Sequence, residues 1–232
     1  MHAKSLKYLV FAWCSILSKS GFAQVHIGLS AGLTHSAFQV GDPASEGVWV
    51  NSAYTTNMQA GILTEIPLKE SFFLQSCLFL AGVGSEVNQR GFMQGMSQHQ
   101  LILLTYAELP FQLLYKRQLN QNWRAIIGGG FYLGYGIKGT QTGVGISNGQ
   151  TYVIEEKVAF SNEQGQHYPI TIRPFDFGGT AQVGVERKQF QLSAGFRLGF
   201  TKLLTEPSFD EANYRNKVFS LSLAYYFLQI GK

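Results

Sequence analysis

Cysteine is almost missing from this 232-residue chain. Its two cysteines are Cys14, inside an apolar N-terminal segment, and Cys77. Once the N-terminal segment is removed, one thiol remains and no intramolecular disulfide can form. We therefore expect sheet closure rather than cross-links to stabilise the fold, with Cys77 as a small packing residue.

Charge is also scarce, because charged residues make up 14% of the chain. The formal net charge of +4 depends largely on the N-terminus. Residues 1–23 hold three lysines and no acid, which leaves 15 bases against 14 acids in the remainder. No basic patch is left to recognise a polyanion, so we expect no nucleic-acid partner.

Motifs for cofactors and catalysis are missing as well. No Cys/His cluster suggests a metal site, and the glycine groups at 82–84, 128–130 and 143–145 lack the spacing of a nucleotide- or phosphate-binding loop. One histidine and serine are adjacent, His35 and Ser36, but neighbours on a strand point to opposite faces and cannot form a nucleophile–base pair. We expect no metal, no cofactor and no enzymatic activity.

The N-terminus has the features of an export signal. Lys4 and Lys7 precede a ten-residue apolar run and then small residues that end at Ala23. Ten residues at about 1.5 Å each are too short to cross roughly 30 Å of hydrocarbon as a helix. We predict that residues 1–23 are a cleavable signal peptide and that residues 24–232 form one β-barrel domain.

What the chain does contain is long, regular alternation of apolar with small or polar residues. From 218 to 227, for example, Phe219, Leu221 and Leu223 alternate with Ser220 and Ser222. This period of two is that of a β-strand with one apolar face. Eight such strands are predicted, at residues 25–38, 54–67, 72–87, 101–115, 123–137, 175–186, 190–201 and 218–227.

The connections between these segments alternate long, short, long, short, long, short, long. Strands of about ten residues are long enough to cross a bilayer when tilted, and a closed barrel leaves no backbone group unpaired in lipid. We therefore predict an all-β fold, an eight-stranded antiparallel transmembrane β-barrel. It is an up-and-down meander with short periplasmic turns and long external loops.

A soluble eight-stranded barrel of lipocalin type is the competing architecture. It would turn the apolar face inward, whereas a membrane barrel shows that face to lipid. The opposite face carries six charges together with many small residues, which suit a narrow lumen where opposite charges pair. These charges are the predicted lumen network: Glu65, Glu108, Arg124, Asp176, Glu186 and Arg197.

Within that network we expect Arg197 to pair with Glu186 and Asp176 on neighbouring strands. The longest connection, residues 138–173, is the segment in which we look for binding. Residues 151–160 have strand-like composition and either extend the barrel as a hairpin, whose edge docks a partner strand, or form a solvated loop.

Several segments resemble the outer-membrane β-barrel families common in Bacteroidetes, including the group named for PorT. The resemblance covers the mature chain. It rests on residues 25–34 after an Ala-Gln junction, on Glu108-Leu109-Pro110, on the glycine and aromatic pattern at 128–136, on Phe175-Asp176-Phe177-Gly178 and on the final aromatic strand. It implies a fold more than a function.

Three functional hypotheses follow. The first is a non-enzymatic outer-membrane barrel with a packed polar lumen and a structural or surface-interaction role. The second, which the PorT resemblance implies, is an accessory component of a protein secretion system, and the third is a narrow pore or a lipid-modifying enzyme. The partners expected are outer-membrane lipid and lipopolysaccharide, the barrel-insertion machinery, and an envelope protein bound through the external loops. The expected location is the cell outer membrane.

Overall fold

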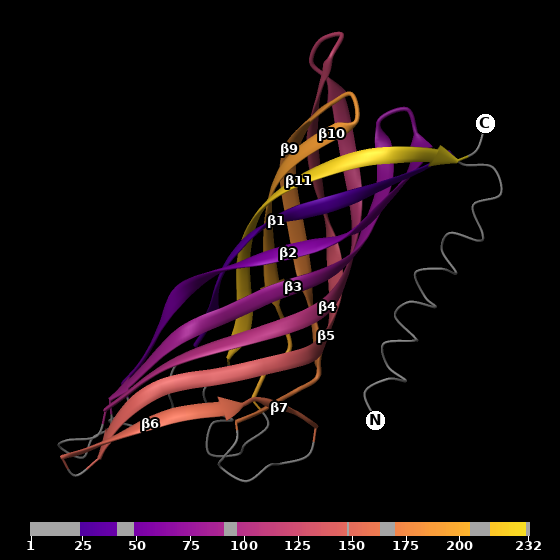
Figure 1. Ribbon diagram of the computed structural model, residues 1–232. Helices are drawn as coiled ribbons and strands as arrows, with labels where there is room; N and C mark the ends of the chain where they lie inside the picture. The colour runs from indigo at the N-terminus through magenta and orange to yellow at the C-terminus, as the bar shows by residue number, and fades with distance from the viewer. Residues whose placement is uncertain are drawn as a thin grey trace.

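The computed structural model describes residues 24–40, 49–90, 97–147, 149–162, 170–204 and 214–230. Eight long strands form one closed antiparallel ring (Figure 1). Each strand pairs with the next along the chain, β5 pairs with β9, and β1 pairs with β11 to close the ring. The strands are β1 (Val25–Gln39), β2 (Trp49–Lys69), β3 (Phe72–Arg90), β4 (Ser97–Gln118), β5 (Trp123–Ser147), β9 (Phe175–Arg187), β10 (Phe190–Gly199) and β11 (Arg215–Ile230).

The predicted meander is therefore confirmed, and so is the direction in which each face points. On β11, Leu221 and Leu223 are more than half exposed, whereas Ser222 between them is buried. On β10, Phe190 is exposed and Gln191 is 2% exposed. The apolar face lies outside, as lipid requires, and the polar face lies in the lumen.

Short turns and long connections lie at opposite ends of the ring. In Figure 1 the short turns and the C-terminal end of β11 are at the upper end, and the strand ends that flank the long connections are at the lower end. Several strands are longer than predicted at the external end: β2 begins at Trp49 rather than at residue 54, and β5 continues to Ser147 rather than ending at 137. The extra residues alternate less clearly, which is why their pattern did not reveal them.

The segment after residue 138 forms a hairpin, which confirms the first of the two alternatives expected for it. β6 (Gln150–Lys157) pairs with the external part of β5, from Thr140↔Lys157 to Ser147↔Gln150. Figure 1 shows this hairpin leaning out beyond the ring at its lower end. The described residues that follow β6, at 158–160 and 170–172, pack over the barrel mouth.

An apolar plug closes the external mouth. Inward side chains of the ring contribute to it, and they pack against side chains of the connecting segments. The plug comprises Phe38, Val83, Val87, Ile102, Leu104, Tyr106, Val158, Ile172, Leu203, Tyr214 and Val218, with Val40, Phe160, Ile170 and Leu204 against it. The lumen is therefore roofed by a small hydrophobic core rather than open to the outside.

Backbone hydrogen bonds hold the connecting segments in this plug. β7 (Ala159–Phe160) and β8 (Thr171–Ile172) form a two-stranded parallel sheet. The Val158 amide donates to the carbonyl of Gly139, and the Arg173 amide donates to the carbonyl of Leu203. These bonds satisfy polar backbone groups where the chain enters an apolar environment.

Two glycines of β5 make room for the plug. A Cβ on Gly136 would lie 2.1 Å from the Phe160 ring, and one on Gly139 would lie 2.7 Å from Cβ of Val158.

Among the described residues, no helix is both long and apolar enough to cross a membrane.

Replacing Gly136 by Ala is expected to push Phe160 out of the mouth, because the added methyl group overlaps the ring. Trypsin should then cleave more quickly after Lys157, the exposed residue that precedes the plug segment. Gly129→Ala in the same strand is the control, since its Cβ would meet only the Thr180 carbonyl oxygen at 3.4 Å. Equal cleavage rates in the two variants would show that the plug does not depend on this contact.

Candidate functional site

The lumen is the candidate site, because it gathers the six charges that the sequence singled out. Five of them are buried, and the side chain of Arg124 is 36% exposed at the periplasmic mouth. They do not form one network. They are divided between two layers, one near the periplasmic turns and one nearer the plug.

The periplasmic layer is organised by a lysine that the sequence analysis did not select. Nζ of Lys116 donates to Oε1 of Glu65 at 2.5 Å and also to Oε2 of Glu186. Arg124 donates to the other oxygen of Glu186, and the hydroxyl of Tyr226 donates to Glu65 at 2.8 Å. Two carboxylates thus meet two cations, so the buried charge of this layer is balanced.

The signal for Lys116 was present in the sequence. Glu108, Gln112 and Lys116 follow the same period of two, but the predicted strand ended at residue 115. Because β4 continues to Gln118, the alternation carries Lys116 into the lumen, where it is 3% exposed.

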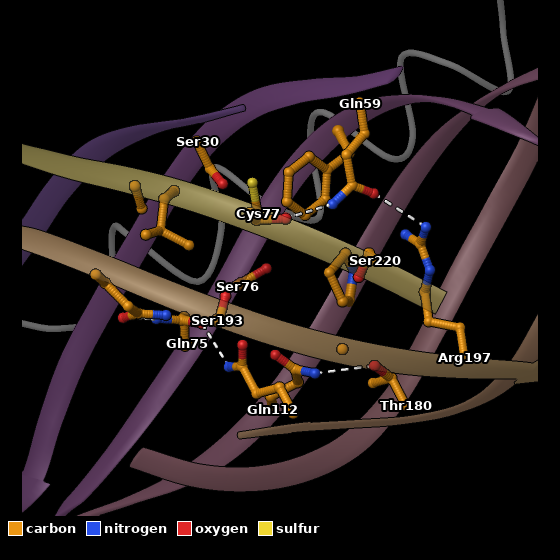
Figure 2. Close-up of a pocket in the computed structure, with 18 residues that line it drawn as sticks. Ser30, Gln59, Gln75, Ser76, Cys77, Gln112, Thr180, Ser193, Arg197 and Ser220 are labelled. Atoms are coloured by element: carbon orange, nitrogen blue, oxygen red, sulfur yellow. Dashed lines mark hydrogen bonds between the residues drawn. The ribbon is translucent and has the colours of Figure 1, made fainter. Parts of the chain in front are cut away.

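A layer of glutamines lies directly on these ion pairs. Nε2 of Gln75 is 3.0 Å from Glu65 and 3.1 Å from Oε1 of Gln191, and Gln182 donates to Oε1 of Gln75 at 2.8 Å. An amide both donates and accepts, so such side chains satisfy each other across a narrow lumen. Figure 2 shows Gln75 together with Gln59 and Gln112, which line the same cavity from the two neighbouring strands.

The second layer corrects the expected pairing of Arg197. Its guanidinium donates to Glu108, on the far side of the lumen, and to Oε1 of Gln59 at 3.0 Å. The expected salt bridge with Glu186 is wrong, because Arg197 stands opposite Thr180 and Glu186 lies six residues further along β9. At about 3.3 Å per residue that offset is roughly 20 Å.

Asp176 is held mainly by neutral donors. The hydroxyl of Tyr132 donates to its Oδ2 at 2.8 Å, and Nδ2 of Asn216 donates to the same oxygen at 2.7 Å. Within the described residues, the expected salt bridge between Arg197 and Asp176 does not form, since the guanidinium of Arg197 is paired with Glu108. The outer layer therefore joins one guanidinium, two carboxyl groups and a tyrosine directly beneath the plug.

Between the two layers lies a small polar cavity, shown in Figure 2. Its volume is about 50 Å³. Since one water needs roughly 10–15 Å³ of such volume, the cavity has room for a few waters and not for a solute. A second cavity of about 320 Å³ lies at the periplasmic mouth, beside His26, Arg124 and Lys188.

The other residues considered for catalysis, His35, Ser36 and Cys77, do not face one another. The exposed His35 ring faces outward and has its Nδ1 3.1 Å from the Thr56 hydroxyl, whereas Ser36 is buried and donates to the Gly84 carbonyl. Cys77 is buried in an apolar cluster of the lumen. Within the described ranges, no group of three or more His, Cys, Asp or Glu side chains is arranged to hold a metal ion.

Replacing Arg197 by Leu is expected to lower the stability of the folded barrel by about 3–5 kcal/mol, because Glu108 is left buried without its cation. The loss should appear as a lower temperature at which the unboiled protein loses its fast gel mobility. Arg124→Leu is the control, since its side chain is partly exposed and Glu186 keeps Lys116. The account requires the control to melt much closer to the wild type; equal losses would contradict it.

A comparison with protein families agrees with this architecture. The family model described as outer membrane protein beta-barrel domain matches residues 20–205. No curated protein matches the chain.

Solved structures give weak similarity over nearly the whole chain. OprG from Pseudomonas aeruginosa has a TM-score of 0.42 at 11% identity, with 90% of this chain and 96% of that chain covered. Ail, the attachment invasion locus protein of Yersinia pestis, has a TM-score of 0.37 at 12% identity, covering 89% and 99%. The outer membrane protease OmpT from Escherichia coli has a TM-score of 0.37 at 9% identity, covering 90% and 98%. Because these scores are low, they add no argument about function. The family match covers most of the chain, and the chain belongs to the outer membrane protein beta-barrel family.

Proposed function

We propose that this protein is a non-enzymatic outer-membrane barrel that conducts no solute and serves the envelope through its rigid wall and its external surface. The observation that carries the proposal is the double obstruction of the lumen. Ion pairs and glutamines fill its periplasmic half, and the apolar plug fills its external mouth.

Neither obstruction depends on the other. The periplasmic layer is held by side chains of the ring itself, from Lys116 to both Glu65 and Glu186. The plug additionally uses Val158, Ile172 and Leu203 from the connections. An eight-stranded ring leaves space only for side chains, so a pore requires both groups to move at once.

The purified barrel is therefore expected to give no discrete current steps in a planar lipid bilayer. A sixteen-stranded porin in the same bilayer serves as the positive control, because its ring encloses an aqueous channel. Reproducible openings of the folded wild-type chain would contradict the proposal. They would favour a narrow pore instead.

The β5–β6 hairpin is the element through which we propose that a partner binds. In the described part of the chain, β6 pairs only with β5, so its other edge offers unpaired backbone groups. Val153 is 77% exposed, and its pairing partner Val144 is 44% exposed. Natural edge strands are usually protected by charge, yet residues 150–154 carry none and the charges begin at Glu155.

The same edge favours a second candidate function, an accessory role in a secretion system of the PorT type. Such a subunit requires a stable envelope partner, which binds by adding a strand to an exposed edge. Isolation of the folded protein from outer membranes separates the two functions. A stoichiometric partner that is lost on replacing Val153 by Lys would support the accessory role, and a barrel isolated alone would support the first proposal.

Export and insertion complete the proposal. Residues 1–23 lie outside the described residues, and we infer from their lysines and apolar run that they direct export and are then removed. The barrel-insertion machinery then assembles the ring from the periplasmic side. We also assign the chain to the PorT-like barrels, on the glycine and aromatic motifs of β5 and β9.

A further inference from the structure

At the external end of β11, the outward side chains change from apolar to positively charged. Its outward side chains from Tyr225 to Phe219 are apolar and exposed, and the next two outward positions are Lys217 and Arg215. Lys217 is two residues beyond Phe219, or about 7 Å along the strand. The two cations therefore stand at the external boundary of the apolar band, where lipid headgroups begin.

The neighbouring strands bring matching side chains to the same level. His35 on β1 pairs with Phe219 on one side and with Thr56 on the other. The His35 ring stacks on Tyr54, with centroids 4.7 Å apart and planes 11° from parallel. Three strands thus build one continuous surface at this boundary, rather than presenting isolated charges.

Lys217 is held over this surface. Its Nζ lies 6.0 Å from the Tyr54 ring centroid and 5.8 Å from the Phe219 ring centroid. Such contacts orient an ammonium group without neutralising it. Among the described residues, no carboxylate forms a salt bridge with Lys217 or Arg215.

We propose that His35, Tyr54, Lys217 and Arg215 form a binding site for the phosphate group of a phosphorylated glycolipid in the outer leaflet. An ammonium and a guanidinium are the groups that bind phosphate oxygens, and aromatic side chains belong at the headgroup level. The site adjoins the exposed Leu33 and Met58, which offer an apolar surface to the acyl chains. That continuity with the apolar band favours a membrane lipid over a free anion.

The opposite rim of the barrel supplies a matched control. Arg187 lies at the periplasmic end of β9, with its guanidinium carbon 5.3 Å from the Trp123 ring centroid. It is also an exposed cation over an aromatic ring, but it faces the other leaflet. A general effect of removing rim cations would appear at both ends.

The test uses the full mature chain, refolded in detergent, with diphosphorylated lipid A, dephosphorylated lipid A or inorganic phosphate added separately. Diphosphorylated lipid A should raise the melting temperature of the wild type more than dephosphorylated lipid A does, and inorganic phosphate should not raise it. In the double variant Lys217→Gln, Arg215→Gln the two lipids should become equal, and native mass spectrometry should show about tenfold less bound diphosphorylated lipid. Arg187→Gln should behave like the wild type.

Three outcomes would contradict the proposed phosphate site. Equal effects of the two lipids on the wild type would mean that the phosphate is not recognised, and an equal effect of inorganic phosphate would mean that a free anion is the ligand. A double variant that keeps its preference for the phosphorylated lipid would place recognition elsewhere. Lys217→Arg retains the charge and should retain the preference, and gel mobility of the unboiled protein verifies that every variant folds.

Discussion

Closure of eight strands into one ring is the constraint on which the rest of this structure depends. Every second side chain must enter a lumen too narrow for bulk water, and every other one must face lipid. Charges placed inside are therefore desolvated and have to be paired, which is what Lys116 does for both Glu65 and Glu186. The same closure turns the alternating apolar face of strands such as β10 and β11 to the outer surface.

The lumen meets this constraint in three different ways along its length. Near the periplasm, cations and carboxylates balance each other. In the middle, glutamines such as Gln75 and Gln182 satisfy one another by hydrogen bonds. At the external mouth, where the strands extend past the ion pairs, the apolar plug fills the lumen. The plug includes Val158 and Ile172, which belong to the connections between strands. In a barrel filled in this way, the surfaces that a partner can reach lie outside the lumen, on the β5–β6 hairpin and around Lys217.

The fold was largely predictable because facing and period are local properties of the sequence. Leu221 and Ser222 are adjacent, and their chemistry alone indicates which of them meets lipid. The pairing of charges was not predictable in the same way, because Arg197 and Glu108 lie across the lumen and their proximity depends on the stagger of the whole ring. Lys116 was missed because the end of β4 was placed too early. The plug was missed because side chains such as Leu203 come from segments with no period, so only the folded connection reveals their common surface.

The direction in which the two faces point is the central claim, and a lipid-dissolved photoactivatable carbene probe tests it without any substitution. After irradiation of the barrel in a bilayer, peptide mass spectrometry reads the labelled positions on β11 residue by residue. The account predicts label on Phe219, Leu221 and Leu223 and none on Ser220, Ser222 and Ala224. Label on the second set, with the first set protected, would contradict it and would indicate a barrel with its apolar face inside.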